Sequence, residues 1–92
     1  MTRGRRSLAQ KLLEELKDEE ETEDIYLVSY DFIEEKPHHR FWSNFKEIIK
    51  QAGGERIQYS LYLGGRRGAK ALRALAEAYG ADVRCFVAYE IR

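Results

Sequence analysis

The chain has 92 residues, 35% of them charged, and a net charge of zero, which suits one small domain with a single core. No run of about 18 apolar residues is present, so we expect no membrane span. The basic first ten residues lack the apolar core of a secretory signal. Cys85 is the only cysteine, which excludes an internal disulfide and indicates a cytoplasmic protein.

Residues 1–24 are predicted to form a charged N-terminal extension, and residues 25–92 the main domain. Leucines at helical spacing predict a helix in the extension, with Ser7 as its N-cap; they are Leu8, Leu12, Leu13 and Leu16. Bases lead and acids trail in this segment, which opposes the helix dipole. The helix therefore needs a partner surface, and without one the acidic run 18–24 is a solvated linker.

The main domain begins with a predicted strand, Ile25–Phe32. Pro37 is placed in the first turn of a helix, whose apolar face extends from Phe41 to Ala52 before Gly53 and Gly54 end it. Further along the chain we expect an alternating strand (57–63), a flexible basic turn (64–68), a second amphipathic helix (69–79) and a last strand (83–91).

The order of these elements leaves two folds open. If the strand 57–63 bends near Ser60 into a hairpin, the result is an α+β ferredoxin-like βαββαβ sandwich. Its helices would lie on one face of an antiparallel sheet, with the helical extension added. If the strand does not bend, three strands remain and parallel crossovers dominate.

Asp31 is the first candidate site residue, because it places a carboxylate at the end of an apolar strand, where Asp is depleted. Two interpretations compete: Asp31 is part of a functional site, or it caps the following turn by accepting backbone N–H bonds. The pattern of residues alone does not decide between them.

Two sequence segments resemble the Cas-two family of CRISPR-associated proteins. One is the strand that ends in Tyr30 and Asp31; the other is Arg56–Gly64, RIQYSLYLG. The resemblance covers roughly Ile25 to Ile91, and IQYSLYLG is its most specific part. The family generally lacks an extension like residues 1–24.

The resemblance implies a ferredoxin-like fold, a homodimer and nucleic acid, DNA or RNA, as partner. It also implies a place in CRISPR spacer acquisition beside an integrase, or a metal-dependent endonuclease activity. By position, Asp31 matches the metal-binding and catalytic aspartate of the family, with Mg²⁺ or Mn²⁺ as cofactor. Tyr30, Arg40 and Arg56 match residues expected at the nucleic acid.

A single carboxylate supplies too few oxygen ligands for a hard divalent cation. A two-fold axis through the strand ends would supply a second Asp31 from the partner subunit. Such a pair could hold an ion that activates water.

A second candidate site is a cluster of bases without an intervening acid, near the start of the second predicted helix. Glycines and a helix N-terminus favour anions there, so we expect a phosphate-binding patch; the alternative is a solvated helix face. The patch consists of Arg66, Arg67, Lys70 and Arg73. For Arg40, the alternative to phosphate binding is an ion pair with Glu34, Glu35 or Asp31.

Two other functions fit the same residues. One is a toxin-type ribonuclease similar to the VapD group. The other is a non-catalytic ferredoxin-like module that binds no nucleic acid.

Overall fold

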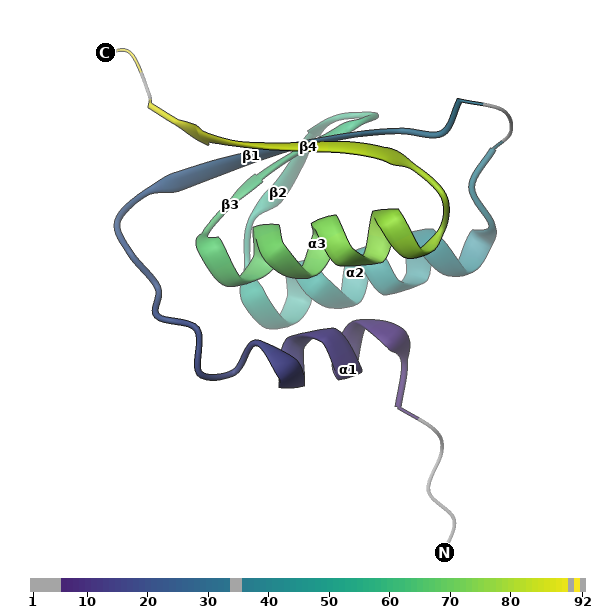
Figure 1. Ribbon diagram of the computed structural model, residues 1–92, viewed down its shortest axis with the longest axis horizontal. Coiled ribbons are helices and arrows are strands. Elements are labelled where there is room, and N and C mark those ends of the chain that lie inside the picture. Colours follow the sequence, from purple (N-terminus) through teal and green to yellow (C-terminus); the bar gives the residue numbers. More distant parts are fainter. Residues whose placement is uncertain (1–5, 34–35, 90, 92) are drawn as a thin grey trace, which may run out of the picture.

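The computed structural model describes residues 6–33, 36–89 and 91, and Figure 1 shows helices and strands in an α+β order. No helix in this described part combines the length and apolar character that crossing a membrane requires. In chain order the elements are α1 (Leu8–Glu15), β1 (Ile25–Asp31), α2 (His39–Ala52), β2 (Glu55–Gln58), β3 (Leu61–Gly64), α3 (Arg66–Ala78) and β4 (Asp82–Ala88).

The four strands form one antiparallel sheet in the order β2-β3-β1-β4. The chain bends at Tyr59 and Ser60 between β2 and β3, so the alternative of three strands with parallel crossovers is wrong. In Figure 1, α2 and α3 cover one face of the sheet, and α1 packs on the side of these two helices that faces away from it. This arrangement is compatible with a ferredoxin-like fold.

Helix α1 is capped within its own sequence and docked on α2. Ser7 Oγ accepts from the Gln10 N–H, and Gln10 Oε1 accepts from the Ser7 N–H, which forms a capping box. The buried Ala9 N–H donates to Asn44 Oδ1 at 2.8 Å. Leu13 is buried in the same core as α2 and α3. The helix thus has the partner surface that its adverse charge order requires.

Helix α2 begins at His39, two residues after Pro37. His38 is its N-cap, since His38 Nδ1 accepts a hydrogen bond from the Arg40 N–H at 3.1 Å. Pro37 therefore precedes the helix, and its placement in the first helical turn is wrong.

Helix α3 begins earlier than predicted. The Ala69 N–H donates to the Gly65 carbonyl at 3.0 Å, which closes the first turn. Arg66, Arg67 and Gly68 are therefore helical, and the flexible basic turn predicted there is wrong.

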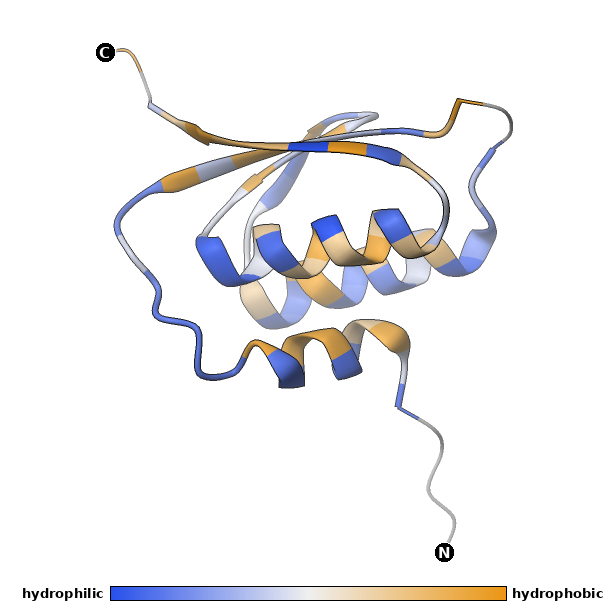
Figure 2. Cartoon of the chain, in the orientation of Figure 1, coloured by the Kyte–Doolittle hydropathy of each residue, from blue (hydrophilic) through white to orange (hydrophobic). Residues whose placement is uncertain are grey.

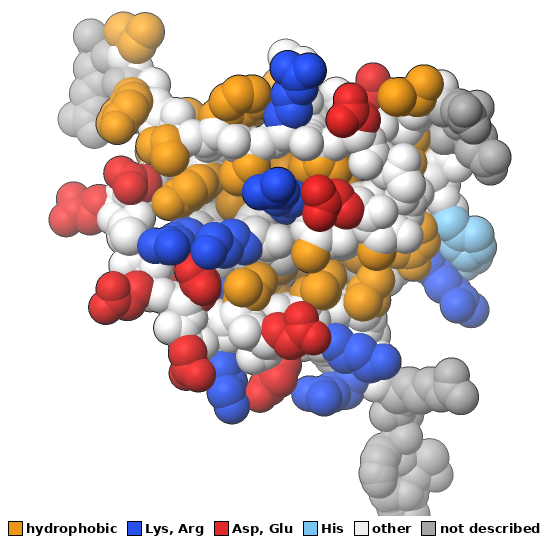
Figure 3. Space-filling view, in the orientation of Figure 1, with side chains coloured by type: hydrophobic (Ala, Val, Ile, Leu, Met, Phe, Trp, Pro, Cys, Tyr) orange, Lys and Arg blue, Asp and Glu red, His pale blue; other side chains and the backbone are white. Residues whose placement is uncertain are grey.

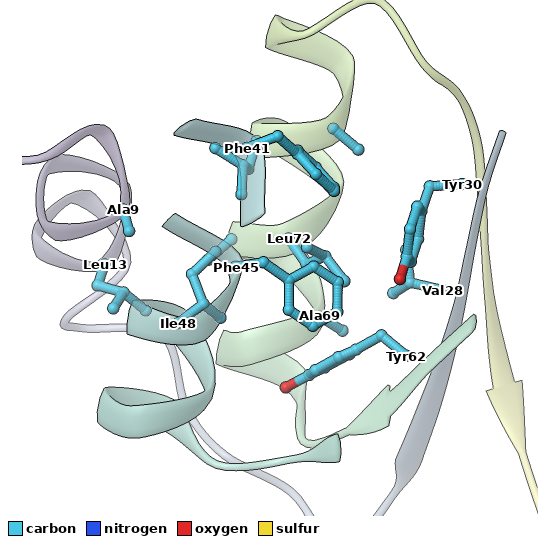
Figure 4. Close-up of a cluster of buried hydrophobic side chains, with 13 residues drawn as sticks. Ala9, Leu13, Val28, Tyr30, Phe41, Phe45, Ile48, Tyr62, Ala69 and Leu72 are labelled. Carbon is cyan, nitrogen blue, oxygen red and sulfur yellow. The ribbon is translucent and has the colours of Figure 1, made fainter. Parts of the chain in front are cut away.

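Tyr62 is fully buried in a slot lined by glycines, and Figure 4 shows its ring among the core side chains. Its hydroxyl donates to the Gly53 carbonyl at 2.8 Å. A Cβ added at Gly54, Gly64 or Gly68 would collide with the Tyr62 ring or hydroxyl. Tyr62 and Gly64 belong to the segment that resembles the Cas-two motif, so this part of the motif serves packing.

The sheet has one face against the helices and one face away from them. Figure 2 shows polar and apolar residues alternating along the first part of β4. Val28 and Tyr30 of β1 are buried against the helices, and successive side chains of a strand point to opposite faces. The outer face therefore carries the other members of the alternation, which are Ile25, Leu27, Ser29 and Asp31 of β1, Leu61 and Leu63 of β3, and Asp82, Arg84 and Phe86 of β4.

Candidate nucleic-acid interface

Asp31 lies opposite a second carboxylate. It is the last residue of β1, and it pairs in register with Asp82, the first residue of β4. Both are exposed, and like charges directly opposite each other on a sheet repel. One chain thus supplies two carboxylates at this end of the sheet, whereas the sequence predicts only the Asp31 of a partner subunit as the second.

The sequence did not predict Asp82 as a site residue, because Asp82 precedes the predicted last strand at a position typical of a turn. The signal that would have found it is topological. Where β4 lies antiparallel to β1, the first residue of β4 neighbours the last residue of β1.

Both interpretations of Asp31, as part of a functional site and as a cap of the following turn, stay predictions. The turn that Asp31 would cap includes residues 34–35, which lie outside the described residues. Within 6–33, 36–89 and 91, no three His, Cys, Asp or Glu side chains come together as a metal-ligand group. A divalent-metal site at Asp31 therefore stays a prediction.

A cavity of about 340 Å³ borders Asp31. It is in the size range of sites for small ligands or parts of larger ones. Lys36 gives it a positive charge opposite the carboxylate, and Tyr59 and Ser60 of the β2–β3 turn form another part of its wall. The remaining lining residues are Tyr30, Phe32, Ile33 and Pro37.

Tyr30 has its ring in the core. Only 1% of the side chain is exposed, and its hydroxyl donates to the Tyr59 carbonyl at 2.9 Å. Burial raises the pKa of Tyr30 to about 12. In this conformation its ring cannot stack on a base, and the hydroxyl instead holds the β2–β3 turn.

The Arg56 guanidinium lies beside two neighbouring aromatic rings, those of Trp42 and Tyr59, whose centroids are 5.4 Å apart. Its guanidinium carbon lies 4.8 Å from the Trp42 ring centroid and 5.7 Å from that of Tyr59. These are cation–π distances. The Tyr59 side chain is 64% exposed, so the cluster reaches the surface.

An apolar groove of about 400 Å³ lies along this cluster. Lys46 adds a second cation to its wall, and no acidic residue lines it. Tyr59 borders both this groove and the Asp31 cavity, which makes the two hollows neighbours. Sequence reasoning identified Arg56 but missed Trp42, Lys46 and Tyr59, because only the fold brings α2 beside the β2–β3 turn.

Arg40 is exposed in the first turn of α2. Among the described residues it forms no ion pair with Asp31. Its other two predicted partners, Glu34 and Glu35, lie outside these residues. The phosphate-binding role of Arg40 stays a prediction.

The predicted phosphate patch on α3 has partners within the chain. Glu19 contacts Arg66 Nε at 3.0 Å and Lys70 Nζ at 2.8 Å. Arg67 Nη2 donates to the Leu13 carbonyl of α1 at 2.9 Å. Arg73 pairs with Glu77, one helical turn further along, at 3.6 Å. Figure 3 shows blue and red side chains side by side over this region. The four bases share one helix, and Arg66, Lys70 and Arg73 are paired with acids of the chain. Their phosphate-binding role stays a prediction.

Comparison with protein-family models, with curated proteins and with solved structures finds no match to this chain. Over its described residues, the structure defines a small α+β protein with a four-stranded antiparallel sheet and three helices. The resemblance to the Cas-two family stays a prediction, which rests on the strand that ends in Asp31 and on the segment Arg56–Gly64.

Proposed function

We propose that this protein is a nucleic-acid-binding protein of the ferredoxin-like βαββαβ class, as the resemblance to the Cas-two family implies. The observation that carries the proposal is the groove of Trp42, Tyr59, Arg56 and Lys46. Aromatic faces stack on bases, while cations in a groove that no acid lines attract the phosphate backbone. The cavity at Asp31, which shares Tyr59 with the groove, extends the same surface.

The experiment compares two charge-matched variants for binding of a fluorescently labelled single strand and duplex. Arg56→Ala/Lys46→Ala removes both cations of the groove. Lys11→Ala/Lys17→Ala removes two exposed cations, one in α1 and one just after it. The groove variant is expected to weaken binding about tenfold or more and to reduce the salt slope by about two. Equal loss in both variants would show that binding depends on net charge and not on the groove.

A second function, metal-dependent phosphodiester hydrolysis, is favoured by the pairing of Asp31 with Asp82 across β1 and β4. Carboxylate oxygens suit Mg²⁺ or Mn²⁺, and an ion bound there would supply Lewis-acid activation of water and phosphate. Two copies of the chain would bring four such carboxylates to one ion site. The outer sheet face, with its half-exposed Phe86, offers a surface for such a homodimer.

Cleavage assays test this second function. Asp31→Asn is expected to abolish Mn²⁺- or Mg²⁺-dependent cleavage of RNA or DNA while nucleic-acid binding persists. If Asp31→Asn cleaves as fast as the natural chain, Asp31 is not the catalytic residue and this second function falls. If neither protein cleaves with either metal, the protein is a binding protein only. The resemblance then places it in CRISPR spacer acquisition as a dimer that serves an integrase.

Growth arrest on expression, relieved by Asp31→Asn, would instead identify a VapD-like ribonuclease. If the protein retains neither the labelled single strand nor the duplex at low salt, the remaining function is a ferredoxin-like interaction module that binds no nucleic acid.

A further inference from the structure

Residues 18–24, the acidic strap, connect α1 to β1 and contact α3. The acidic strap was expected to be a solvated linker, but two of its acids make specific contacts. Glu19 bridges Arg66 and Lys70. Glu21 Oε1 accepts from the Arg66 N–H at 3.0 Å, and Glu21 Oε2 accepts from the Arg67 N–H at 3.4 Å. These partners are more than 40 positions away in the sequence, so only the fold brings them together.

The start of α3 requires an anion from elsewhere. Its N-cap, Gly65, has no side chain to accept from the first N–H groups, and the first turn contains no acid. Arg66 and Arg67 instead add positive charge to the positive end of the helix dipole. The Glu21 carboxylate satisfies these N–H groups and neutralises the charge.

Glu19 and Glu21 have the positions that phosphate groups would take. The Glu21 carboxylate accepts from two successive backbone N–H groups at the helix N-terminus. The Glu19 carboxylate bridges two cations beside it. These donors are groups that also bind phosphate. The approach is close, because a Cβ on Gly65 would lie 2.9 Å from Glu21 Oε1. A phosphate group and the acidic strap therefore exclude each other at this site.

The acidic strap is held at both ends but weakly in between. At one end α1 is fixed by the buried bond from Ala9 to Asn44, and at the other end β1 is in the middle of the sheet. Glu21 itself is exposed, and the Glu19 side chain is 25% exposed. Exposed ion pairs are individually weak and are screened by salt, so a polyanion can compete with them.

We propose that the acidic strap is an autoinhibitory segment that covers a phosphate-binding site at the N-terminus of α3. A polyanion with several phosphate groups displaces Glu19 and Glu21 and then contacts Arg66, Lys70 and the first N–H groups of the helix. With nucleic acid as this polyanion, the inference rests on the proposed function. The site itself can be tested without it.

The test uses two variants of the full chain with equal net charge. Glu19→Ala/Glu21→Ala removes the two contacting acids, and Glu20→Ala/Glu23→Ala removes two exposed acids from the same strap. The first readout is the NMR signal of the Arg66 and Arg67 amides during titration with inorganic pyrophosphate. The second is fluorescence anisotropy of a labelled strand across a range of salt concentrations.

Both readouts are expected to respond only in Glu19→Ala/Glu21→Ala. The two amide signals should shift with pyrophosphate in this variant, and remain in place in the natural chain and the control. Its affinity for the strand should rise about five- to tenfold at low salt, with a salt slope steeper by about one to two, against less than twofold in the control. Unresponsive amides in Glu19→Ala/Glu21→Ala, or equal tightening in both variants, would overturn the inference. If no form of the protein binds nucleic acid but the amides respond to pyrophosphate, the inference stands and the proposed function falls.

Discussion

Tyr62 shows how one buried side chain constrains distant parts of the sequence. Its ring and hydroxyl exclude a Cβ at Gly54, Gly64 and Gly68, which come from the α2–β2 turn, β3 and α3. Gly54 is also required by its φ of 89°, a conformation that L side chains rarely adopt, whereas Gly64 and Gly68 have negative φ and are limited by space.

Replacing Gly68 by Ala tests this slot. Alanine has the higher helix propensity, worth about 1 kcal/mol in favour of the variant, but its Cβ would collide with the Tyr62 hydroxyl. Overpacking costs about 1–3 kcal/mol, so we expect Gly68→Ala to lower the free energy of unfolding. Urea denaturation measures the change.

A double-mutant cycle with Tyr62→Phe supplies the control. Tyr62→Phe alone should cost about 1 kcal/mol through the lost bond to Gly53. In that background Gly68→Ala should become neutral or stabilising, because the hydroxyl that it meets is gone. An unchanged cost of Gly68→Ala would show that something other than Tyr62 requires the glycine.

The two buried tyrosines make stability fall in alkali. Burial raises the pKa of Tyr30 and of Tyr62 to about 12, while tyrosines in the unfolded chain ionise near their ordinary value of about 10. Between these values the unfolded chain binds fewer protons, so stability decreases as the pH rises. The expected slope is about 1.4 kcal/mol per pH unit for each tyrosine. Urea midpoints measured across this range for the natural chain and for Tyr62→Phe should show the smaller slope in the variant.

At the scale of elements, Asn44 fastens α1 to the rest of the molecule. Its side chain is 8% exposed. It accepts from the Ala9 N–H and donates through Nδ2 to the Arg40 carbonyl at 2.7 Å. The amide thus joins the extension to α2.

We expect Asn44→Ala to destabilise the protein by about 2 kcal/mol, since it leaves the buried Ala9 N–H without its acceptor. Hydrogen exchange of the α1 amides should rise more than that of the sheet amides. Ser43→Ala, at the exposed neighbouring position of the same helix, serves as the control and should change neither measurement. Uniform acceleration of exchange in all elements would contradict a local fastening role.

At the scale of the whole molecule, all three helices lie on one side of the sheet (Figure 1). The outer face of the sheet is left without a helix among the described residues. Phe86 on this face is 48% exposed. Large exposed apolar side chains grouped on one face indicate an interaction surface, and the proposed homodimer would cover it.

Phe86→Lys is therefore expected to convert a dimer into a monomer, as measured by sedimentation equilibrium, with little change in thermal stability of the monomer. Val87→Lys is the matched control, because Val87 is 47% exposed but points to the helix side of β4. Dissociation by both variants would place the contact at the strand edge and not on the outer face.

Much of the fold follows from the sequence because its signals are local. The apolar run of β1, the helical spacing of apolar residues in α1 and α2, and the glycines after Ala52 predict elements close to those observed. Of the two helix starts that were wrong, that of α2 depends on the local cap by His38, and that of α3 on a remote partner. The first turn of α3 is stable because Glu21 caps it, and Glu21 is linked to Arg66 only through the fold.

The sequence by itself determined that Asp31 lies at the end of a strand and that four bases cluster near the start of α3. It also placed Arg56 in the segment Arg56–Gly64, which resembles the Cas-two motif. Tertiary structure decided the rest. It placed Asp82 opposite Asp31, brought Trp42 and Tyr59 beside Arg56, and paired Arg66 and Lys70 of α3 with Glu19 of the strap. The physical reason is that a side chain's neighbours in a sheet and between layers are far away in the chain, where periodicity and composition carry no signal.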